Sequence, residues 1–365
     1  MTGLLETALT NTHRLLDATL TDFAGWSMPL RYSSDRAEHA AVRESAGIFD
    51  LSHMAQLEVE GPGASDALDA SFVTQPSKMT IGRARYTLIL TADGGIIDDL
   101  IVYRLSEASY LVVANAANRL VVRDELASRA RAVGAEASIT DTTLHRALIA
   151  IQGPRSTEIV RELLPESEHE LFDSLGYYRV CDVHVEGPVR LARTGYTGET
   201  GYELMMPASQ AEAVWDRATE IGRERGLTPC GLASRDTLRL EAGMALYGHE
   251  LNRDLCPADV GLANLVKDHQ FVGRQALGGR EQVWDLYGLV GEGKRAARAG
   301  CTVSRAGEEL GEITSGVLSP TLGHPIALAR LRPGLSAGDS VSVDVRGKTH
   351  EMRITQLPFY SRTRS

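Results

Sequence analysis

Apolar residues in this chain are grouped into short runs, and two of these runs flank a strong turn signal. The runs cover residues 87–90 and 96–103, and Asp93-Gly94 lies between them. An Asp-Gly pair favours a tight two-residue turn because its glycine accepts a positive φ angle. The pattern therefore predicts a β-hairpin whose second strand covers residues 96–103.

Two adjacent carboxylates, Asp98 and Asp99, interrupt this second strand. Neighbouring residues of a strand point to opposite faces, and both faces are otherwise apolar here. At least one carboxylate is therefore expected in partly dry surroundings, where a charge destabilises the fold unless it is paired or used. The alternative is that one aspartate binds turn amides and the other reaches solvent. Strand alternation alone does not choose between Asp98 and Asp99.

Helical and strand patterns alternate through the first half of the chain. A helix is predicted for residues 34–46, where Gly47 would end it. Further on, a strand over residues 110–115 precedes a helix from about residue 118 to 133. Asn115 stands at the end of this strand, just before the helix. We expect its amide either to cap the helix or to bond the polar edge of a ligand.

One arrangement, a strand followed by Gly-Pro and a helix, occurs twice. Strands over residues 56–59 and 147–152 precede Gly61-Pro62 and Gly153-Pro154, respectively. Proline suits the start of a helix because its missing N–H would have no partner there. No adjacent lysine supports the alternative of a phosphate-binding loop. The repetition indicates two related α+β units.

The pattern changes from about residue 286 to short strands separated by glycine and proline. Examples cover residues 326–329, 340–345 and 352–355. Many short strands at close spacing are typical of a small all-β barrel or sandwich. The chain is therefore expected to be α+β with a C-terminal β domain.

Composition and charge exclude several classes of function. The 365 residues are 43% hydrophobic and carry a formal net charge of −10, which argues against a nucleic-acid partner or an anionic membrane. The four cysteines lie far apart, so neither a zinc site nor a disulfide framework is indicated. The first residues lack a signal-peptide pattern, and no run is long enough to span a bilayer. A cytoplasmic protein is expected.

Residues 193–204 form the densest candidate site. Three glycines, two tyrosines and two glutamates fall within this segment, between apolar strands. Glycines let the backbone approach a ligand closely, and tyrosines offer flat, amphipathic contact. Glu203 begins the next strand, where a fixed carboxylate can accept two parallel N–H bonds from an amidine-like edge. A plain tight hairpin is the alternative.

Two further side chains are candidates for binding or catalysis. Arg235 stands where a loop enters a helix, and its guanidinium can bind a carboxylate or carbonyl of a ligand or, alternatively, join a salt-bridged helix start. His53 precedes a strand, with no other ligand residue at metal spacing. A satisfied structural histidine is favoured there over an acid, base or metal ligand.

Together these segments resemble the glycine cleavage system T-proteins, the aminomethyltransferases. The resemblance runs from Phe23-Ala24-Gly25-Trp26 to Leu357-Pro358-Phe359-Tyr360. Its markers, in chain order, are Phe49-Asp50-Leu51-Ser52-His53-Met54, Gly94-Gly95-Ile96-Ile97-Asp98-Asp99-Leu100, Thr194-Gly195-Tyr196-Thr197-Gly198-Glu199, Arg235-Asp236-Thr237-Leu238-Arg239-Leu240-Glu241-Ala242-Gly243 and Ile313-Thr314-Ser315-Gly316.

The resemblance implies a fold and a reaction. Two interleaved, folate-binding α+β domains are expected within residues 1–284 and a C-terminal β barrel or sandwich within residues 285–365, giving three domains around a central channel. The expected reaction takes the aminomethyl group from the lipoyl arm of H-protein. It passes the methylene to tetrahydrofolate, the co-substrate, and releases ammonia, 5,10-methylenetetrahydrofolate and the dihydrolipoyl arm. No metal ion is expected.

The resemblance also assigns roles to particular residues. The functional aspartate of the family falls on Asp98, the first of the pair, where a buried carboxylate would stabilise positive charge on the reacting carbon. The carboxylate that holds the pterin falls on Glu203. The remaining expected folate contacts are Arg235, Tyr86, Asn115 and Arg364.

Related families with other activities fit the sequence less well. Iron–sulfur-assembly relatives carry Lys-Gly-Cys-Tyr-x-Gly-Gln-Glu, whereas the matching residues 243–250 contain no cysteine. Flavin-linked relatives require a dinucleotide-binding Gly-x-Gly-x-x-Gly segment, which does not open this chain. The alternatives that stay open are another folate-dependent methyl or demethylating transferase of the same fold and a non-enzymatic folate-binding protein.

Overall fold

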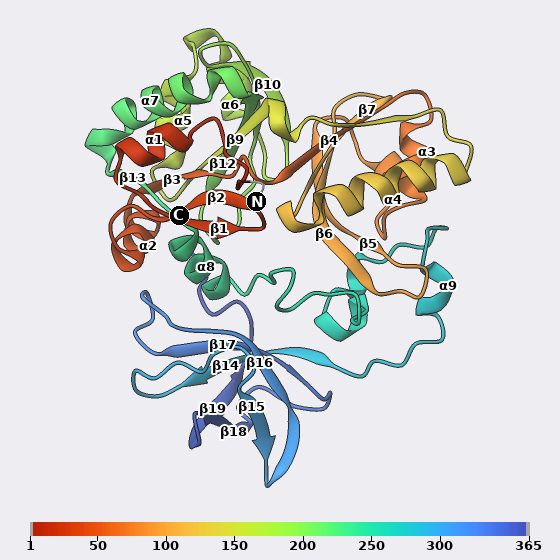
Figure 1. The fold of residues 1–365 in the computed structure, drawn as a ribbon, viewed down its shortest axis with the longest axis vertical. Coiled ribbons are helices and arrows are strands. Elements are labelled where there is room, and N and C mark those ends of the chain that lie inside the picture. Colours follow the sequence, from red (N-terminus) through yellow and green to blue (C-terminus); the bar gives the residue numbers. More distant parts are fainter. Residues whose placement is uncertain (1–2, 363–365) are drawn as a thin grey trace. The chain divides into compact units, whose positions relative to one another are not determined.

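The chain folds into two units in the computed structural model, which describes residues 3–362 (Figure 1). Unit 1 holds the chain up to Thr87 together with Leu100–Gly195 and Glu199–Arg235. Unit 2 holds Leu88–Asp99, Tyr196–Gly198 and the chain from Asp236 onward. The predicted domain boundary between residues 284 and 285 stays a prediction.

A six-stranded sheet carries much of the core of unit 1. Its order is β10 (Val180–His184), β11 (Pro188–Ala192), β12 (Gly201–Pro207), β9 (Arg146–Gln152), β3 (Ala46–Asp50) and β13 (Leu227–Pro229). Only the pair formed by β13 and β3 is parallel. Helices α5 (Ser156–Leu163) and α7 (Ala211–Gly222) lie over this sheet and bury Val160 and Trp215 in its core (Figure 1).

A five-stranded sheet follows the order β5 (Arg83–Leu90), β6 (Ile96–Arg104), β7 (Ser109–Ala114), β4 (Ala55–Glu60) and β8 (Ser138–Asp141). Helices α3 (Ala64–Asp69) and α4 (Arg119–Ala132) belong to unit 1, as does the sheet except for the end of β5 and the start of β6. Strands β4 and β9 are each followed by a Gly-Pro pair and then a helix, as the sequence predicts.

The predicted hairpin is formed by β5 and β6, but its turn is longer than two residues. The connection spans Thr91–Gly95, closed by hydrogen bonds from Thr91 N to Gly95 O (2.8 Å) and from Gly94 N to Thr91 O (3.0 Å). Gly94 has the expected positive φ of 89°. The turn is longer because the Thr91 hydroxyl also accepts a bond from Gly95 N (2.8 Å), which holds the wider loop.

Helix α2 (Asp35–Glu44) begins at the N-cap Ser34, whose hydroxyl accepts a bond from Ala37 N (3.2 Å). The prediction that Gly47 ends this helix is wrong, because Gly47 lies within strand β3. A Cβ atom at this position would lie 2.5 Å from Val42 Cγ2 and 2.7 Å from Cys230 Sγ. The glycine therefore serves close packing of the strand against its neighbours.

A closed six-stranded barrel forms the C-terminal part of unit 2, which confirms the barrel over the sandwich. Every pairing is antiparallel, and β14 pairs with both β17 and β19. The interior is filled by aliphatic side chains such as Leu289, Val343 and Ile354. The strand order is β14 (Asp285–Gly291), β17 (Pro325–Leu331), β16 (Glu308–Leu318), β15 (Thr302–Arg305), β18 (Ser340–Val345) and β19 (Lys348–Thr355).

Smaller elements complete the fold. They are α1 (Thr10–Leu15), the two-stranded sheet of β1 (Thr19–Phe23) and β2 (Trp26–Arg31), α6 (His169–Asp173), α8 (Leu232–Glu241) and α9 (Arg274–Leu277). Within residues 3–362, none of the helices has the length and apolar character needed to cross a membrane.

Candidate active site

The glycine-rich segment before β12 is shaped by a side chain of the protein itself. Gln152, at the end of β9, donates from Nε2 to Thr194 O (3.2 Å). A Cβ atom at Gly195 would lie 2.0 Å from Gln152 Oε1, and one at Gly201 would lie 2.2 Å from Gln152 Nε2. The two glycines therefore make room for the Gln152 side chain. The sequence analysis had instead predicted that these glycines let the backbone approach a ligand.

Glu203 lies in the middle of this arrangement, on β12, and its side chain is buried. Its Oε2 atom accepts hydrogen bonds from the hydroxyl groups of Thr194 and Tyr103, the latter at 3.3 Å. Its Oε1 atom makes no hydrogen bond within residues 3–362. A carboxylate offers about four lone-pair positions, so this one is fixed on one oxygen and can still accept N–H donors on the other.

Two tyrosines accompany the Glu203 carboxylate in unit 1. Burial, followed by the nearby Glu203 charge, raises the pKa of the Tyr103 hydroxyl well above its ordinary value. Burial also raises the pKa of Tyr178, with smaller contributions from Tyr177 and Glu203. Both phenols therefore stay protonated and can donate hydrogen bonds around the carboxylate.

Tyr178 occupies a strained backbone conformation, with φ at 57°. Non-glycine residues rarely adopt positive φ and tend to do so where a functional side chain must be aimed. Two backbone bonds hold this conformation, from Tyr178 N to Arg193 O (3.0 Å) and from Ala84 N to Tyr178 O (2.9 Å). Sequence analysis did not identify Tyr178, because the strain that marks it is visible only in three dimensions.

Arg235 lies in the first turn of α8, at the entry to the helix that was predicted. The preceding Gly231 fixes this entry, because its N–H donates to Glu38 Oε2 (2.8 Å) and a Cβ atom there would lie 2.3 Å from Leu30 O. The Arg235 guanidinium is close enough to His53 to influence its titration. Arg235 and His53 therefore belong to one region of unit 1.

His53 is buried, and its Nδ1 atom makes no hydrogen bond within the described part of the chain. Burial lowers the pKa of this histidine to about 4; Asp50 acts against that shift and Arg235 adds to it. The ring is thus neutral at pH 7, with the Phe23 ring edge-on at 5.4 Å between centroids. The expectation of a fully satisfied structural histidine is not met, since one ring nitrogen has no partner.

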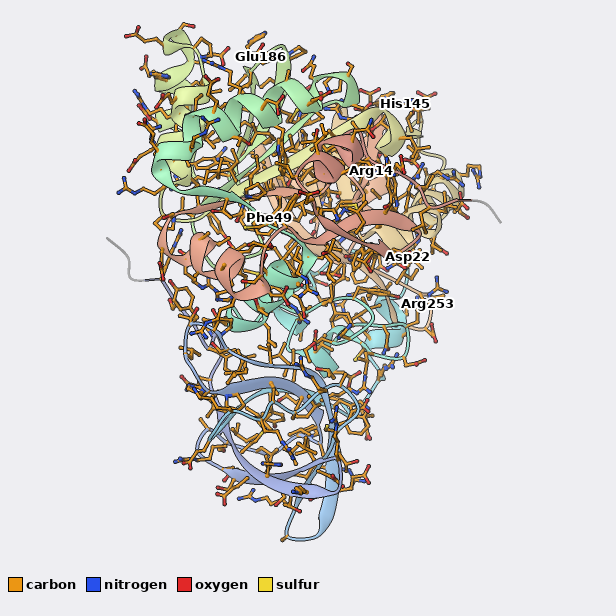
Figure 2. The ribbon with its side chains drawn as sticks, turned by 60° about the vertical axis from the view of Figure 1, so that its left-hand side comes forward. Arg14, Asp22, Phe49, His145, Glu186 and Arg253 are labelled. Atoms are coloured by element: carbon orange, nitrogen blue, oxygen red, sulfur yellow. The ribbon has the colours of Figure 1, made fainter. Side chains whose placement is uncertain are left out.

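Asp50 anchors the segment that leads to His53. Its Oδ2 atom accepts bonds from the Thr7 hydroxyl (2.6 Å) and His13 Nε2 (2.9 Å), and its Oδ1 atom accepts one from Ser52 N (2.9 Å). Burial acts to raise the pKa of Asp50, but these bonds outweigh it, and the pKa lies below its ordinary value. The carboxylate therefore stays charged and holds the end of β3. Phe49, the preceding residue of this strand, is labelled in Figure 2.

The remaining predicted folate contacts occupy the five-stranded sheet or lie beyond the described residues. Tyr86 lies on β5 and is half-buried, and Asn115 directly follows β7. Asn115 makes no side-chain capping bond to the following helical turn, so that alternative for its amide is not realised. Arg364 lies outside the described residues. Unit 1 thus contains Glu203, Arg235, Tyr86 and Asn115.

Asp98 belongs to unit 2, on the part of β6 next to the turn. Its side chain is fully buried, whereas Asp99 on the opposite strand face is half-exposed. The prediction that at least one carboxylate lies in dry surroundings is confirmed. The turn amide of Gly95 is bound by the Thr91 hydroxyl (2.8 Å).

A loop of unit 2 clamps the hairpin just before Asp98. Ile96 N donates to Leu255 O (3.0 Å), and the Tyr247 hydroxyl donates to Ile96 O (3.4 Å). A Cβ atom at Gly95 would lie 1.9 Å from the backbone oxygen of Arg253, whose side chain is labelled in Figure 2. The loop thus binds both the backbone N–H and the carbonyl oxygen of Ile96, two residues before Asp98.

Polar residues at the end of α8 serve unit 2 itself. The buried Arg239 donates to Glu250 Oε2 (2.9 Å) and to the Ser315 hydroxyl (2.8 Å). Glu241 accepts bonds from the hydroxyl groups of Ser319 and Thr321. Two of the segments that carry the family resemblance therefore meet through structural hydrogen bonds. Within residues 3–362, no group of three or more histidine, cysteine or acidic side chains is arranged to hold a metal ion.

Comparison with known proteins gives full-length matches. The family model described as the GCVT N-terminal domain matches residues 9–270, and the glycine cleavage T-protein C-terminal barrel domain matches residues 285–361. The chain is 49% identical to an aminomethyltransferase of Cutibacterium acnes, with both chains fully covered. It is 50% identical to an aminomethyltransferase of Streptomyces avermitilis, with 98% of each covered.

A solved structure agrees with these matches. The crystal structure of the glycine cleavage system aminomethyltransferase T from Bartonella henselae superimposes with a TM-score of 0.90 and 32% sequence identity. The superposition covers 98% of each chain.

Proposed function

Because the chain belongs to the glycine cleavage T-protein family of aminomethyltransferases, we propose that it transfers a methylene group from an aminomethyl-lipoyl carrier to tetrahydrofolate. The carrier is the lipoylated H-protein. The S–CH2–NH2 unit loses its amine as ammonia, and the carbon joins N5 and N10 of the folate. The lipoyl sulfur leaves as a thiol of the dihydrolipoyl arm.

The observation that carries this proposal is the half-satisfied Glu203 carboxylate. Thr194 and Tyr103 hold Oε2, and Oε1 has no hydrogen bond within residues 3–362. The amino-pyrimidine edge of a pterin presents two parallel N–H donors, which match a carboxylate in the same plane. Burial of Glu203 strengthens these bonds, because water does not compete with them.

We assign the charge-stabilising role to Asp98. Loss of ammonia leaves positive charge on the methylene carbon, and a buried carboxylate stabilises that charge more strongly than an exposed one would. Asp98 is fully buried, and the loop that binds Ile96 fixes the strand before it. Asp99 is more exposed and is assigned no role in the chemistry.

The other assignments concern the rest of the folate molecule. Arg235 supplies a guanidinium for a carbonyl or carboxylate of folate, and Tyr86 and Asn115 contact the same ligand. Arg364 is assigned to folate on the family resemblance alone. The protein would act in the cytoplasm, where the carrier and folate are both present, and would need no metal ion.

The test is to mix the protein with aminomethyl-loaded H-protein and tetrahydrofolate and to measure ammonia and 5,10-methylenetetrahydrofolate. One equivalent of each is expected per aminomethyl group. If folate binds but no ammonia appears, the protein is a folate binder or acts on another donor. Demethylation of a small sulfonium compound by tetrahydrofolate would then identify the alternative transferase.

A further inference from the structure

Helix α2, labelled in Figure 1, carries one half of a buried ion pair. Arg43, in the last turn of the helix, donates from Nη1 to Glu199 Oε1 at 2.9 Å. The side chains of Arg43 and Glu199 are only 6% and 5% exposed. A buried ion pair adds little net stability, because the desolvation of both charges offsets their attraction. It does fix the two segments that carry the charges, since either charge left unpaired in a dry site is costly.

Glu199 stands where the chain re-enters unit 1. The chain leaves unit 1 after Gly195 and returns at Glu199, just before β12 begins at Gly201. Glu203, to which the pterin is assigned above, lies one turn of the strand pleat further along β12. Arg43 therefore holds the point from which this strand starts.

The next residue, Thr200, is held by the turn that follows β9. Its carbonyl oxygen accepts bonds from Gly153 N (2.8 Å) and from the Ser156 hydroxyl (3.1 Å). The end of α2 packs closely on this turn, since a Cβ atom at Gly153 would lie 2.6 Å from Ser45 O. Helix α2 thus acts on two consecutive residues of the loop, one through an ion pair and one through the turn.

The other end of the loop contacts the Glu203 carboxylate directly. The Thr194 hydroxyl donates to Glu203 Oε2, and Gln152 Nε2 holds the Thr194 carbonyl oxygen (3.2 Å). The backbone of Glu203 is fixed by the pairing of β12 with β9, where it lies opposite Ala150. The direction of its carboxylate depends in addition on Thr194, and therefore on the loop. A displacement at the far end of this short loop is expected to move Thr194.

Helix α2 is itself a fixed support. The fully buried Glu38 accepts bonds on Oε1 from Tyr32 N (2.7 Å) and Ser33 N (2.8 Å), and on Oε2 from Gly231 N (2.8 Å). Gly231 directly precedes α8, whose first turn carries Arg235. One helix therefore holds both the entry to α8 and the loop before β12.

We propose that Arg43 is a positioning residue, which acts through Glu199 on the loop and so on the direction of the Glu203 carboxylate. The proposal rests on the function proposed above, which places the pterin at Glu203. Arg43 itself needs no contact with folate or with the reacting atoms. Because Glu203 would hold the pterin equally before and during the reaction, loss of Arg43 should weaken folate binding rather than slow the chemical step.

The experiment compares the unmodified protein with Arg43→Gln, Glu199→Gln and the double variant, in turnover with aminomethyl-loaded H-protein. We expect the KM for tetrahydrofolate to rise about five- to tenfold in each single variant, with kcat within about twofold of the unmodified value. The double variant should have about the same KM as either single variant, because both substitutions break one interaction. Dissociation constants from calorimetry should change in parallel.

Arg129→Gln is the matched control. Arg129, on α4, is 4% exposed and donates from Nη2 to Glu125 (2.8 Å) and from Nη1 to Ser71 O (3.0 Å). Its loss should lower the unfolding temperature but leave the KM for tetrahydrofolate unchanged. Thermal unfolding of every variant sets the temperature at which all are folded and compared. The double variant of the ion pair has no unpaired charge, so it should unfold at a higher temperature than Arg43→Gln.

Four results would overturn the proposal. Unchanged KM and dissociation constant in folded Arg43→Gln would remove Arg43 from the site while leaving the proposed function intact. Losses that multiply in the double variant would show that Arg43 does not act through Glu199. An equal loss of folate affinity in Arg129→Gln would mean that any buried arginine of unit 1 has this effect. Failure of the unmodified protein to bind tetrahydrofolate would overturn the proposed function as well.

Discussion

Tyr103 donates a hydrogen bond from its hydroxyl group to Glu203 Oε2, at 3.3 Å, from a neighbouring sheet of the same unit. Both side chains are buried. A carboxylate in such surroundings is costly unless donors surround it. The tyrosine, together with Thr194, therefore keeps one oxygen of Glu203 in place and leaves the other for a ligand.

Replacing this tyrosine should weaken the site without abolishing it. Tyr103→Phe removes one donor to a charged acceptor, so we expect folate binding to weaken about two- to tenfold, with about 1 kcal/mol lost from the free energy of unfolding. Tyr110→Phe is the control, because the buried Tyr110 hydroxyl makes no hydrogen bond within residues 3–362. Calorimetric titration with tetrahydrofolate should give a weaker affinity for Tyr103→Phe than for Tyr110→Phe. Equal affinities would show that Tyr103 is not part of the site.

The Glu203 carboxylate should contribute more to folate affinity than the Tyr103 hydroxyl does. Glu203→Gln replaces an ionised acceptor with an amide that presents only one carbonyl oxygen, so folate should bind about 10- to 100-fold more weakly. Glu107→Gln, on an exposed turn, serves as the control for loss of one negative charge. The dissociation constants of both variants decide the matter, and unchanged affinity in Glu203→Gln would place the pterin elsewhere.

Much of the fold follows from local patterns in the sequence. Two apolar runs and the Asp93-Gly94 pair between them locate the hairpin that carries Asp98, and the short C-terminal strands indicate a barrel or sandwich. These features depend on neighbouring residues only. The length of the turn does not, because the Thr91 side chain decides it by binding Gly95 N.

The positions that were missed depend on contacts between distant residues. Gly47 resembles a helix stop in sequence, but it lies within β3, where Val42 and Cys230 leave no room for a Cβ atom. Gly195 and Gly201 accommodate Gln152, which is more than 40 residues away in sequence. Tyr178 has no local signature, since its backbone strain appears only after folding.

Gly95 should be required for the hairpin to hold Asp98 in position. A methyl group in Gly95→Ala would overlap Arg253 O, so the turn or the facing loop must shift. We expect about 1–3 kcal/mol less stability and, because Asp98 is displaced, about 10- to 100-fold slower turnover. Gly279→Ala is the control, since no atom lies within 4 Å of its added methyl group. Normal turnover in Gly95→Ala would show that the clamp does not position Asp98.

The buried His53 predicts a dependence of stability on pH. Its pKa in the folded protein is about 4, below its ordinary value of 6.5, so the unfolded chain binds the proton more readily. The free energy of unfolding should therefore fall as pH decreases from 6.5 toward 4, with about 2 kcal/mol lost between pH 7 and pH 5 through this residue. Urea unfolding of the unmodified protein and of His53→Gln at both pH values measures the difference. An identical pH dependence would show that His53 titrates normally.

The central claim is that Asp98 stabilises the charge formed when ammonia leaves, and it is tested most directly by rapid mixing. Aminomethyl-loaded H-protein and saturating tetrahydrofolate are mixed with the unmodified protein, Asp98→Asn and Asp99→Asn, and the first-turnover rate of ammonia release is measured. We expect Asp98→Asn to bind folate normally but to release ammonia about 100-fold more slowly or worse, an effect typical of losing one electrostatic stabiliser. Asp99→Asn should stay within about threefold of the unmodified rate, as expected for a residue outside the chemistry. Equal losses in the two variants, or full activity in Asp98→Asn, would contradict the account.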